Sequence, residues 1–75
     1  MIKLSFCGGL HKEFKLNESM EFEHKQGMTV GSIIEDLGID EDSLGLVTIN
    51  GILSLPADLV EDNNTVGFFP YVMSG

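Results

Sequence analysis

"TVGSIIEDLG", residues 29–38, is the stretch that decides the fold. Thr29 is a favourable N-cap, and Gly38 followed by apolar Ile39 is typical of a Schellman ending. Glu35 and Asp36 fall on one face, and the other face carries apolar side chains at the spacing i, i+3, i+4 and i+7: Val30, Ile33, Ile34 and Leu37. The stretch therefore predicts one helix of about two to three turns that packs its apolar side on a sheet.

Segments with the pattern of β-strands lie on both sides of this helix. Their apolar side chains alternate or form short runs bounded by turn residues, and they cover residues 1–7, 18–25, 44–50, 52–55 and 65–72. Asn50-Gly51 is the strongest hairpin signal in the chain. Pro56 ends the short fourth strand because proline cannot donate to a strand ladder.

The remaining segments predict connections. Residues 11–18 and 40–43 have the polar composition of loops, and residues 57–64 predict a helical turn followed by a polar turn. The resulting order is strand, strand, helix, strand, short strand, strand. It predicts an α+β protein of the β-grasp (ubiquitin-like) fold, with a mixed sheet of about four to five strands packed on one helix. We expect the first and last strands to be adjacent at its centre, in a single domain over residues 1–75 with a short C-terminal tail over about 71–75.

The charge of the chain excludes some partners. Four lysines, no arginine and 12 carboxylates give a net charge of −8, so the chain cannot neutralise a nucleic-acid backbone and is repelled by anionic membranes. Nor does any apolar stretch approach the roughly 18 residues of a membrane helix. The acidity suits a basic patch on a partner protein, or it serves solubility alone.

Few residues suggest catalysis or metal binding. Cys7, His11 and His24 are the only thiol and imidazole groups, and their spacing matches no nucleophile pair or zinc site. The acidic run at 40–42 lacks the glycine and glutamate of a calcium loop. We therefore expect no metal and no bound cofactor. A single cysteine and the absence of a signal sequence favour a cytoplasmic protein.

The end of the chain, "FFPYVMSG" (68–75), carries the remaining candidate chemistry. Gly75 has no Cβ, so it can enter a narrow channel, and its carboxylate is unhindered for activation to an acyl-adenylate. Ser74 before it is also small. The alternative is that a common residue ends the chain by chance.

Four stretches resemble the small sulfur-carrier proteins of molybdopterin and thiamine biosynthesis (MoaD/ThiS type): MIKLSFCGGL, TVGSIIEDLG, LVTINGIL and VGFFPYVMSG. The similarity covers nearly the whole chain. The helix opening and the Asn-Gly hairpin occur in many such domains. The F-F-P motif followed by a short run to a terminal glycine is more specific, and it is closer to the molybdopterin synthase small subunit than to the thiamine carrier.

The resemblance implies a sulfur-donating small subunit or co-substrate of a sulfurtransferase. In that family a ubiquitin-activating-type adenylating enzyme uses ATP to adenylate the terminal glycine, and sulfur from a persulfide donor then gives a thiocarboxylate. The thiocarboxylate delivers its sulfur to a pterin precursor on the molybdopterin synthase large subunit. Gly75 matches the reacting residue, and Met73 and Ser74 match the tail that enters the partner's channel. Three residues match the apolar segment that docks on partners: Phe68, Phe69 and Pro70.

The tail also departs from the family, which ends Gly-Gly where this chain has Ser74-Gly75, and Val72-Met73 make it bulkier. Other functions agree with the same residues. The chain could be a ubiquitin-like interaction module whose tail is never activated, a protein modifier that ends as an amide to lysine, or a thiamine-type sulfur carrier.

Overall fold

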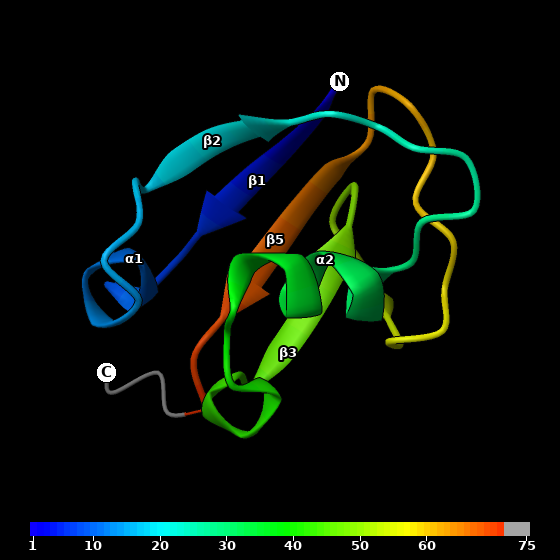
Figure 1. Cartoon of the computed structure of the whole chain (residues 1–75). Coiled ribbons are helices and arrows are strands. Elements are labelled where there is room, and N and C mark those ends of the chain that lie inside the picture. Colours follow the sequence, from blue (N-terminus) through cyan, green and yellow to red (C-terminus); the bar gives the residue numbers. More distant parts are fainter. Residues whose placement is uncertain (72–75) are drawn as a thin grey trace.

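The structure, a computed structural model, describes residues 1–71. In chain order its elements are β1 (Ile2–Phe6), α1 (Leu10–Glu13), β2 (Ser19–Phe22), α2 (Val30–Leu37), the 3₁₀ turn η1 (Glu41–Ser43), β3 (Leu46–Ile49), β4 (Ile52–Ser54) and β5 (Thr65–Phe69). Figure 1 shows β5 and β3 passing behind α2, with the described end of the chain beside η1. None of the helices in this part of the chain is long and apolar enough to cross a membrane.

The five strands form one mixed sheet in the order β2-β1-β5-β3-β4. The central strands β1 and β5 are parallel, with Leu4 opposite Val66, and the other pairs are antiparallel. The first and last strands are thus adjacent at the centre of the sheet, as the sequence predicts. A mixed sheet with α2 on one side is the β-grasp arrangement, so the predicted fold class is confirmed.

The helix α2 has the ends that its sequence predicts. The hydroxyl of Thr29 accepts from the amide of Ser32 at 3.1 Å, and the hydroxyl of Ser32 accepts from the amide of Thr29 at 2.9 Å, which together form a capping box. At the other end Gly38 adopts a left-handed φ of 71°. The amide of Ile39 donates to the carbonyl of Ile34, which completes the Schellman motif.

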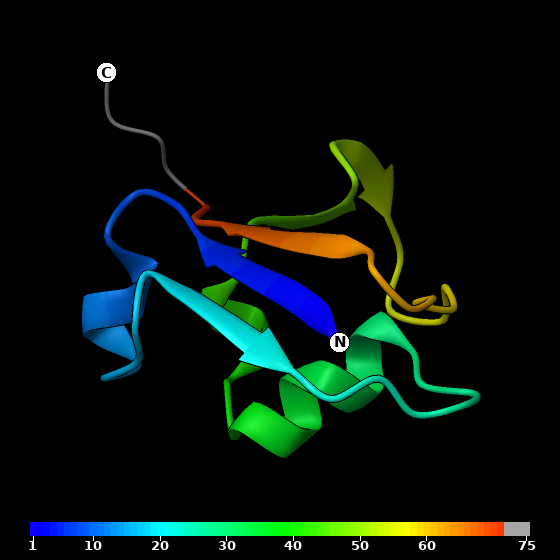
Figure 2. The same cartoon turned by 90° about the horizontal axis from the view of Figure 1, so that it is seen from above.

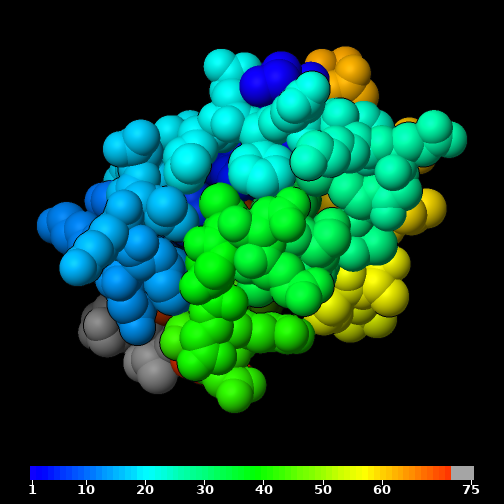
Figure 3. Space-filling view, in the orientation of Figure 1, coloured from blue at the N-terminus to red at the C-terminus, as the bar shows by residue number. Residues whose placement is uncertain are grey.

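The core lies between α2 and the inner face of the sheet. The rings of Phe6 and Phe68 stack there with centroids 4.8 Å apart and an interplanar angle of 12°. Figure 2 shows α2 against this face, and none of the helices of residues 1–71 lies on the opposite face, which we call the open face. The space-filling view shows residues of α2 and η1 covering the inner side (Figure 3). The other fully buried side chains of the core include Ile2, Leu4, Val30, Ile33 and Val66.

The hairpin between β3 and β4 is the predicted two-residue turn. Asn50 and Gly51 both have positive φ angles, 52° and 83°, as a type I′ turn requires. Ile49 and Ile52 close the turn as a cross-strand pair.

Two connections differ from the prediction. Residues 11–18 were expected to form a loop, but Leu10–Glu13 form the short helix α1. The helix is stabilised because Leu10 is buried in the core and Phe14, one turn further along the chain, packs against the same core. Residues 57–64 form no helix. Their backbone pairs with the residues before α2 instead: the amide of Val30 donates to the carbonyl of Asp58 at 3.1 Å, and that of Val60 donates to Met28 at 3.0 Å.

Candidate functional site

The apolar segment expected to dock on partners lies at the end of β5, and its residues have different environments. Phe68 is 0% exposed and stacks on Phe6 in the core. This corrects the expectation that Phe68 contacts a partner, because the side chain has no surface left for one. Phe69 and Pro70 are only partly buried. The docking role therefore stays a prediction for Phe69 and Pro70 alone.

Gly67 makes room for the ring of Phe69 on the open face of the sheet. A Cβ on Gly67 would lie 3.2 Å from Cε1 of Phe69 and 2.8 Å from Oγ1 of Thr48. Phe69 thus folds back over the glycine two residues before it, on the face opposite to α2. A ring held flat on a sheet presents a rigid apolar surface to the outside.

Two exposed leucines lie on the same face as Phe69. Leu46 is directly opposite Phe69 across the β3–β5 pair, and Leu53 is opposite Thr48, two residues along β3 from Leu46. Because alternate residues of a strand share a face, the three side chains form one surface, which we call the open-face patch (Leu46, Leu53 and Phe69). Leu46 is 45% exposed and Leu53 66%.

Sequence reasoning did not identify Leu46 or Leu53 as functional residues. A signal was present, because the Asn50-Gly51 turn fixes which residues of β3 and β4 pair and therefore share a face. What the sequence did not indicate is that no helix among residues 1–71 covers that face, which depends on the position of α2.

A groove of about 440 Å³ adjoins the open-face patch. It passes between η1, the start of β3 and the end of β4, and Tyr71 contributes to its wall. Its apolar lining includes Ile34, Leu44 and Leu55, and the charged residues that the structure places in its lining are both acidic: Glu41 and Asp42. The groove can therefore take an apolar side chain that is followed by a cationic group.

The surface around the patch and the groove is formed largely by an uncharged segment. Residues 43–57 contain no Asp, Glu, Lys, Arg or His, so all 16 acidic and basic residues, 12 plus four, lie outside this segment. It includes four of the large apolar side chains that are exposed in the structure: Leu46, Ile52, Leu53 and Leu55. Depletion of charge with retention of exposed apolar side chains is typical of the centre of a protein–protein interface.

The chain leaves the sheet at Pro70. The last hydrogen bond of β5 on this side runs from the amide of Gly45 to the carbonyl of Phe69, at 2.8 Å. Pro70 has no amide hydrogen, so it cannot extend the ladder. Tyr71 is 69% exposed. The predicted tail begins at about this residue, and the predicted site residues Met73, Ser74 and Gly75 lie outside the described residues.

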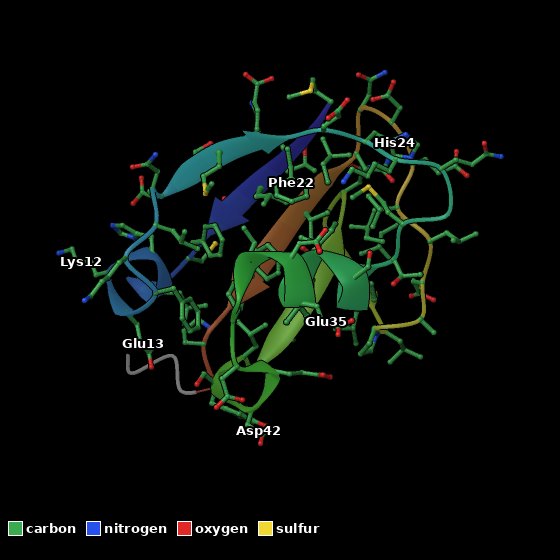
Figure 4. The ribbon with its side chains drawn as sticks, viewed as in Figure 1. Lys12, Glu13, Phe22, His24, Glu35 and Asp42 are labelled. Atoms are coloured by element: carbon green, nitrogen blue, oxygen red, sulfur yellow. The ribbon has the colours of Figure 1, made fainter. Side chains whose placement is uncertain are left out.

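Cys7, His11 and His24 do not form a common site. The backbone amide of Cys7, after β1, donates to the carbonyl of Phe68 at 2.9 Å, and His11 belongs to α1, at one side of the molecule. Figure 4 shows His24 at the opposite side from Lys12 and Glu13 of α1, where its Nε2 lies 2.9 Å from the carbonyl of Val60. Within residues 1–71 no three His, Cys, Asp or Glu side chains are grouped to hold a metal ion.

Comparisons with known proteins agree in the fold. No family model matches the chain, and no curated protein sequence matches it. A structure of a putative molybdopterin converting factor, subunit 1, from Pyrococcus furiosus is similar with a TM-score of 0.75 and 21% identity, over 95% of this chain and 97% of that chain. A crystal structure of SAMP1 from Haloferax volcanii is similar with a TM-score of 0.77 and 15% identity, over 99% and 98% of the two chains.

A second crystal structure, of H. volcanii small archaeal modifier protein 1, has a TM-score of 0.75 and 15% identity over 95% of this chain and 97% of its own. The chain therefore has the same fold as these proteins along nearly its whole length. Sequence identity at this level establishes the fold, and function has to be argued from the site.

Proposed function

We propose that this protein is a sulfur carrier whose Gly75 is adenylated and converted to a thiocarboxylate, and that it donates this sulfur in the biosynthesis of molybdopterin for a molybdenum or tungsten cofactor. The observation that carries the proposal is the course of β5, which lies at the centre of the sheet and leads out of it at Pro70 towards Ser74 and Gly75. The same fold in a putative molybdopterin converting factor subunit supports it.

The fold supplies a rigid base for a reactive arm. Val66 and Phe68 are fully buried and hold β5 in the core, and β5 is paired on both sides, by β1 and β3. A carboxylate delivered into another protein's active site reacts fast only if the approach is oriented. Fixing the strand up to Phe69 leaves the few residues after it to reach the partner.

The docking surface in this proposal is the open-face patch with Pro70. A ubiquitin-activating-type adenylating enzyme binds there first, and an acceptor similar to the molybdopterin synthase large subunit binds next. With a net charge of −8, the chain associates fastest with a partner whose surface is basic. The uncharged segment then forms the dry centre of the contact, and the carboxylates form its rim.

The chemistry proceeds in three steps on the partner enzyme. A carboxylate oxygen of Gly75 attacks the α-phosphorus of ATP, and pyrophosphate leaves. The terminal sulfur of a persulfide donor attacks the carbonyl carbon of the acyl-adenylate, and AMP leaves. A thiol then cleaves the S–S bond of the acyl disulfide, which releases the thiocarboxylate and a new disulfide. ATP is bound by the adenylating enzyme, and the reaction takes place in the cytoplasm.

Ser74 leaves the reacting atoms unchanged. Its Cβ and hydroxyl require a channel slightly wider than one that fits two glycines. The acceptor of this protein is accordingly expected to have a wider channel at the position of Ser74.

Intact-mass analysis tests the proposal. The 75-residue chain is incubated with the adenylating enzyme of the same organism, ATP, Mg²⁺ and a persulfide donor. The expected product has gained the mass difference between sulfur and oxygen. Two matched controls, one lacking Gly75 and one with an alanine added after Gly75, should gain nothing. An unchanged mass of the wild-type chain, while it still binds the enzyme, would overturn the proposal.

A protein modifier is the second candidate, because two of the similar structures are of a small archaeal modifier protein. The two functions share the adenylation of Gly75 and differ in its final bond. A carrier accumulates the thiocarboxylate, whereas a modifier yields an amide between Gly75 and lysine of a target, which survives thiols and hydroxylamine. Mass spectrometry of conjugates isolated from cells separates the two.

A further inference from the structure

Gly45 lies in direct contact with the backbone at the point where β5 ends. A Cβ at position 45 would overlap the carbonyl oxygen of Pro70, and it would lie 2.6 Å from the carbonyl carbon of Pro70 and 2.8 Å from Cα of Tyr71. All three atoms belong to the main chain, so no rotation of a side chain could relieve the overlap. The segment Pro70–Tyr71 is therefore seated against the bare Cα of Gly45.

Space, and not backbone conformation, explains the glycine at this position. Gly27, Gly38 and Gly51 have left-handed φ angles, and a Cβ on any of them would meet nothing within 4 Å. Gly45 is the opposite case, because its φ lies outside the left-handed range and a Cβ would collide with the chain. Gly31 also faces a proline carbonyl, that of Pro56, but at 3.2 Å from the Cβ position, which a small adjustment accommodates.

Two features coincide at this point and fix the direction of the chain. The Gly45 amide holds the carbonyl of Phe69, which is the last hydrogen bond between β3 and β5. Pro70 then restricts the backbone with its fixed φ and cannot pair further. Pro70 and Tyr71 pass over Gly45 at contact distance. A side chain at position 45 would therefore change the direction in which the chain continues after Tyr71.

We propose that Gly45 is a positioning residue: it sets the path by which the chain leaves the sheet, and through that path the delivery of Gly75 to the adenylating enzyme. The first part stands on the contacts of Gly45 alone, and the second rests on the proposed function. Gly45 does not touch the reacting atoms, so it acts only through Pro70 and Tyr71.

The first test uses the protein alone. A nitroxide spin label is attached through Ser74→Cys in a Cys7→Ser background, and the broadening of backbone amide signals by the label is mapped over residues 1–71. Gly45→Ala should redistribute this broadening over the surface. The matched control is Gly27→Ala, which strains a left-handed φ where a Cβ meets nothing within 4 Å and should leave the pattern unchanged. Identical patterns in the two variants would overturn the proposal.

The second test measures adenylation kinetics with the cognate enzyme. Gly45→Ala leaves the side chains of the open-face patch in place but displaces Pro70, which belongs to the proposed docking surface, so KM should rise only slightly, whereas kcat should fall by about 10- to 100-fold, as for a misplacement of about 1 Å. A variant that is only less stable, such as Gly27→Ala, should keep both constants while it is folded. A wild-type kcat for Gly45→Ala would overturn the link to delivery.

Two further controls keep the outcomes separate. If Gly45→Ala does not retain the wild-type amide shifts of Leu4 and Val66, Pro70→Gly replaces it in the spin-label experiment only, because this change frees the same exit without adding an atom to the fold, whereas Pro70 also belongs to the proposed docking surface. If the wild-type chain is never adenylated, the proposed function fails, and the spin-label experiment still decides whether Gly45 sets the exit path.

Discussion

The two ends of β5 are held by different means. At its start the turn before the strand is fixed by polar groups: the amide of Thr65 donates to Oδ1 of Asn50 at 2.9 Å, and the amide of Asn50 donates back to the carbonyl of Thr65 at 2.8 Å. Two further hydrogen bonds add to this network: the amide of Glu61 donates to Oδ1 of Asn64, and the N-terminal ammonium group of Met1 donates to Asp62. At its end, among apolar side chains, the strand is held by two backbone hydrogen bonds, from the amide of Gly45 to Phe69 and from the amide of Cys7 to Phe68, and by the contact with Gly45.

The difference shows how one strand can be both anchored and directed. Hydrogen bonds fix the start locally and demand particular side chains at particular places. The end is defined by packing. Phe68 points inwards, Phe69 lies on the open face, and the path beyond them depends on the absence of a Cβ at Gly45. Variants at the two ends should therefore fail in different ways.

The largest effect is expected from Phe68→Ala, compared with Phe69→Ala as the matched control. Removing the buried ring of Phe68 leaves a cavity beside Phe6 and should lower the free energy of unfolding by about 3–5 kcal/mol. Phe69 is only partly buried, so its truncation should cost about 1 kcal/mol and instead weaken binding to the adenylating enzyme about 10-fold. Urea unfolding and binding isotherms measure both quantities, and equal stability losses would contradict the assignment of the two rings to opposite faces.

A smaller loss is expected at the start of the strand, from Asn50→Ala. This variant should lower the free energy of unfolding by about 2 kcal/mol for two reasons. It loses the hydrogen bond with Thr65, and alanine tolerates the positive φ of position 50 less well than asparagine, whose short polar side chain favours it. Asn50→Gly keeps the turn and loses only the hydrogen bond, about 1 kcal/mol. Both should keep wild-type adenylation kinetics, and a fall in kcat would show that the two ends are coupled.

The smallest effect concerns pH. The hydrogen bond from the terminal ammonium group lowers the pKa of the Asp62 carboxyl from its ordinary value of 3.8, with smaller contributions from the ammonium charge, the Asn63 amide and His24. The folded state thus favours the carboxylate, so the stabilisation is present above pH 3.8 and is lost as the pH falls through the lower pKa of the folded protein.

Asp62→Asn checks this pH dependence. The difference in unfolding free energy between wild type and variant should be small at neutral pH, because the group is exposed, and should vanish in acid. A difference that stays constant across this range would show that the pair does not titrate as the geometry indicates.

The parts of the fold that follow from local chemistry were predictable from the sequence. The ends of α2 are defined by Thr29 and Gly38, and the β3–β4 hairpin by Asn50-Gly51, because each needs only its neighbours to form. The helix α1 was missed because four residues contain too little periodicity, and Leu10 helps to stabilise it only once the sheet exists. The helical turn expected at the start of residues 57–64 is wrong because pairing with the segment before α2 satisfies the backbone there, whereas the polar turn expected after it is present at Asp62-Asn63.

The candidate site was predictable only as far as the alternation of β5. The resemblance assigned docking to the apolar segment at 68–70, which stays a prediction for Phe69 and Pro70, and alternation places Phe68 and Phe69 on opposite faces. Which face is covered, and that Leu46 and Leu53 join Phe69, depend on strand order and on the position of α2. The role of Gly45 depends on a contact between two segments that are 25 residues apart, 70 minus 45, and no local pattern encodes it.

The parallel pairing of β1 with β5 has a consequence for synthesis of the protein. The two strands that meet at the centre of the sheet are the first and the last of its five strands in chain order, with Lys3 opposite Thr65. Such non-local pairing is slow to form, and here it cannot begin until β5 has been synthesised and has left the ribosome. A chain released before Phe68 would lack its central strand and half of its aromatic stack. Formation of the central pair thus requires a chain that extends through β5.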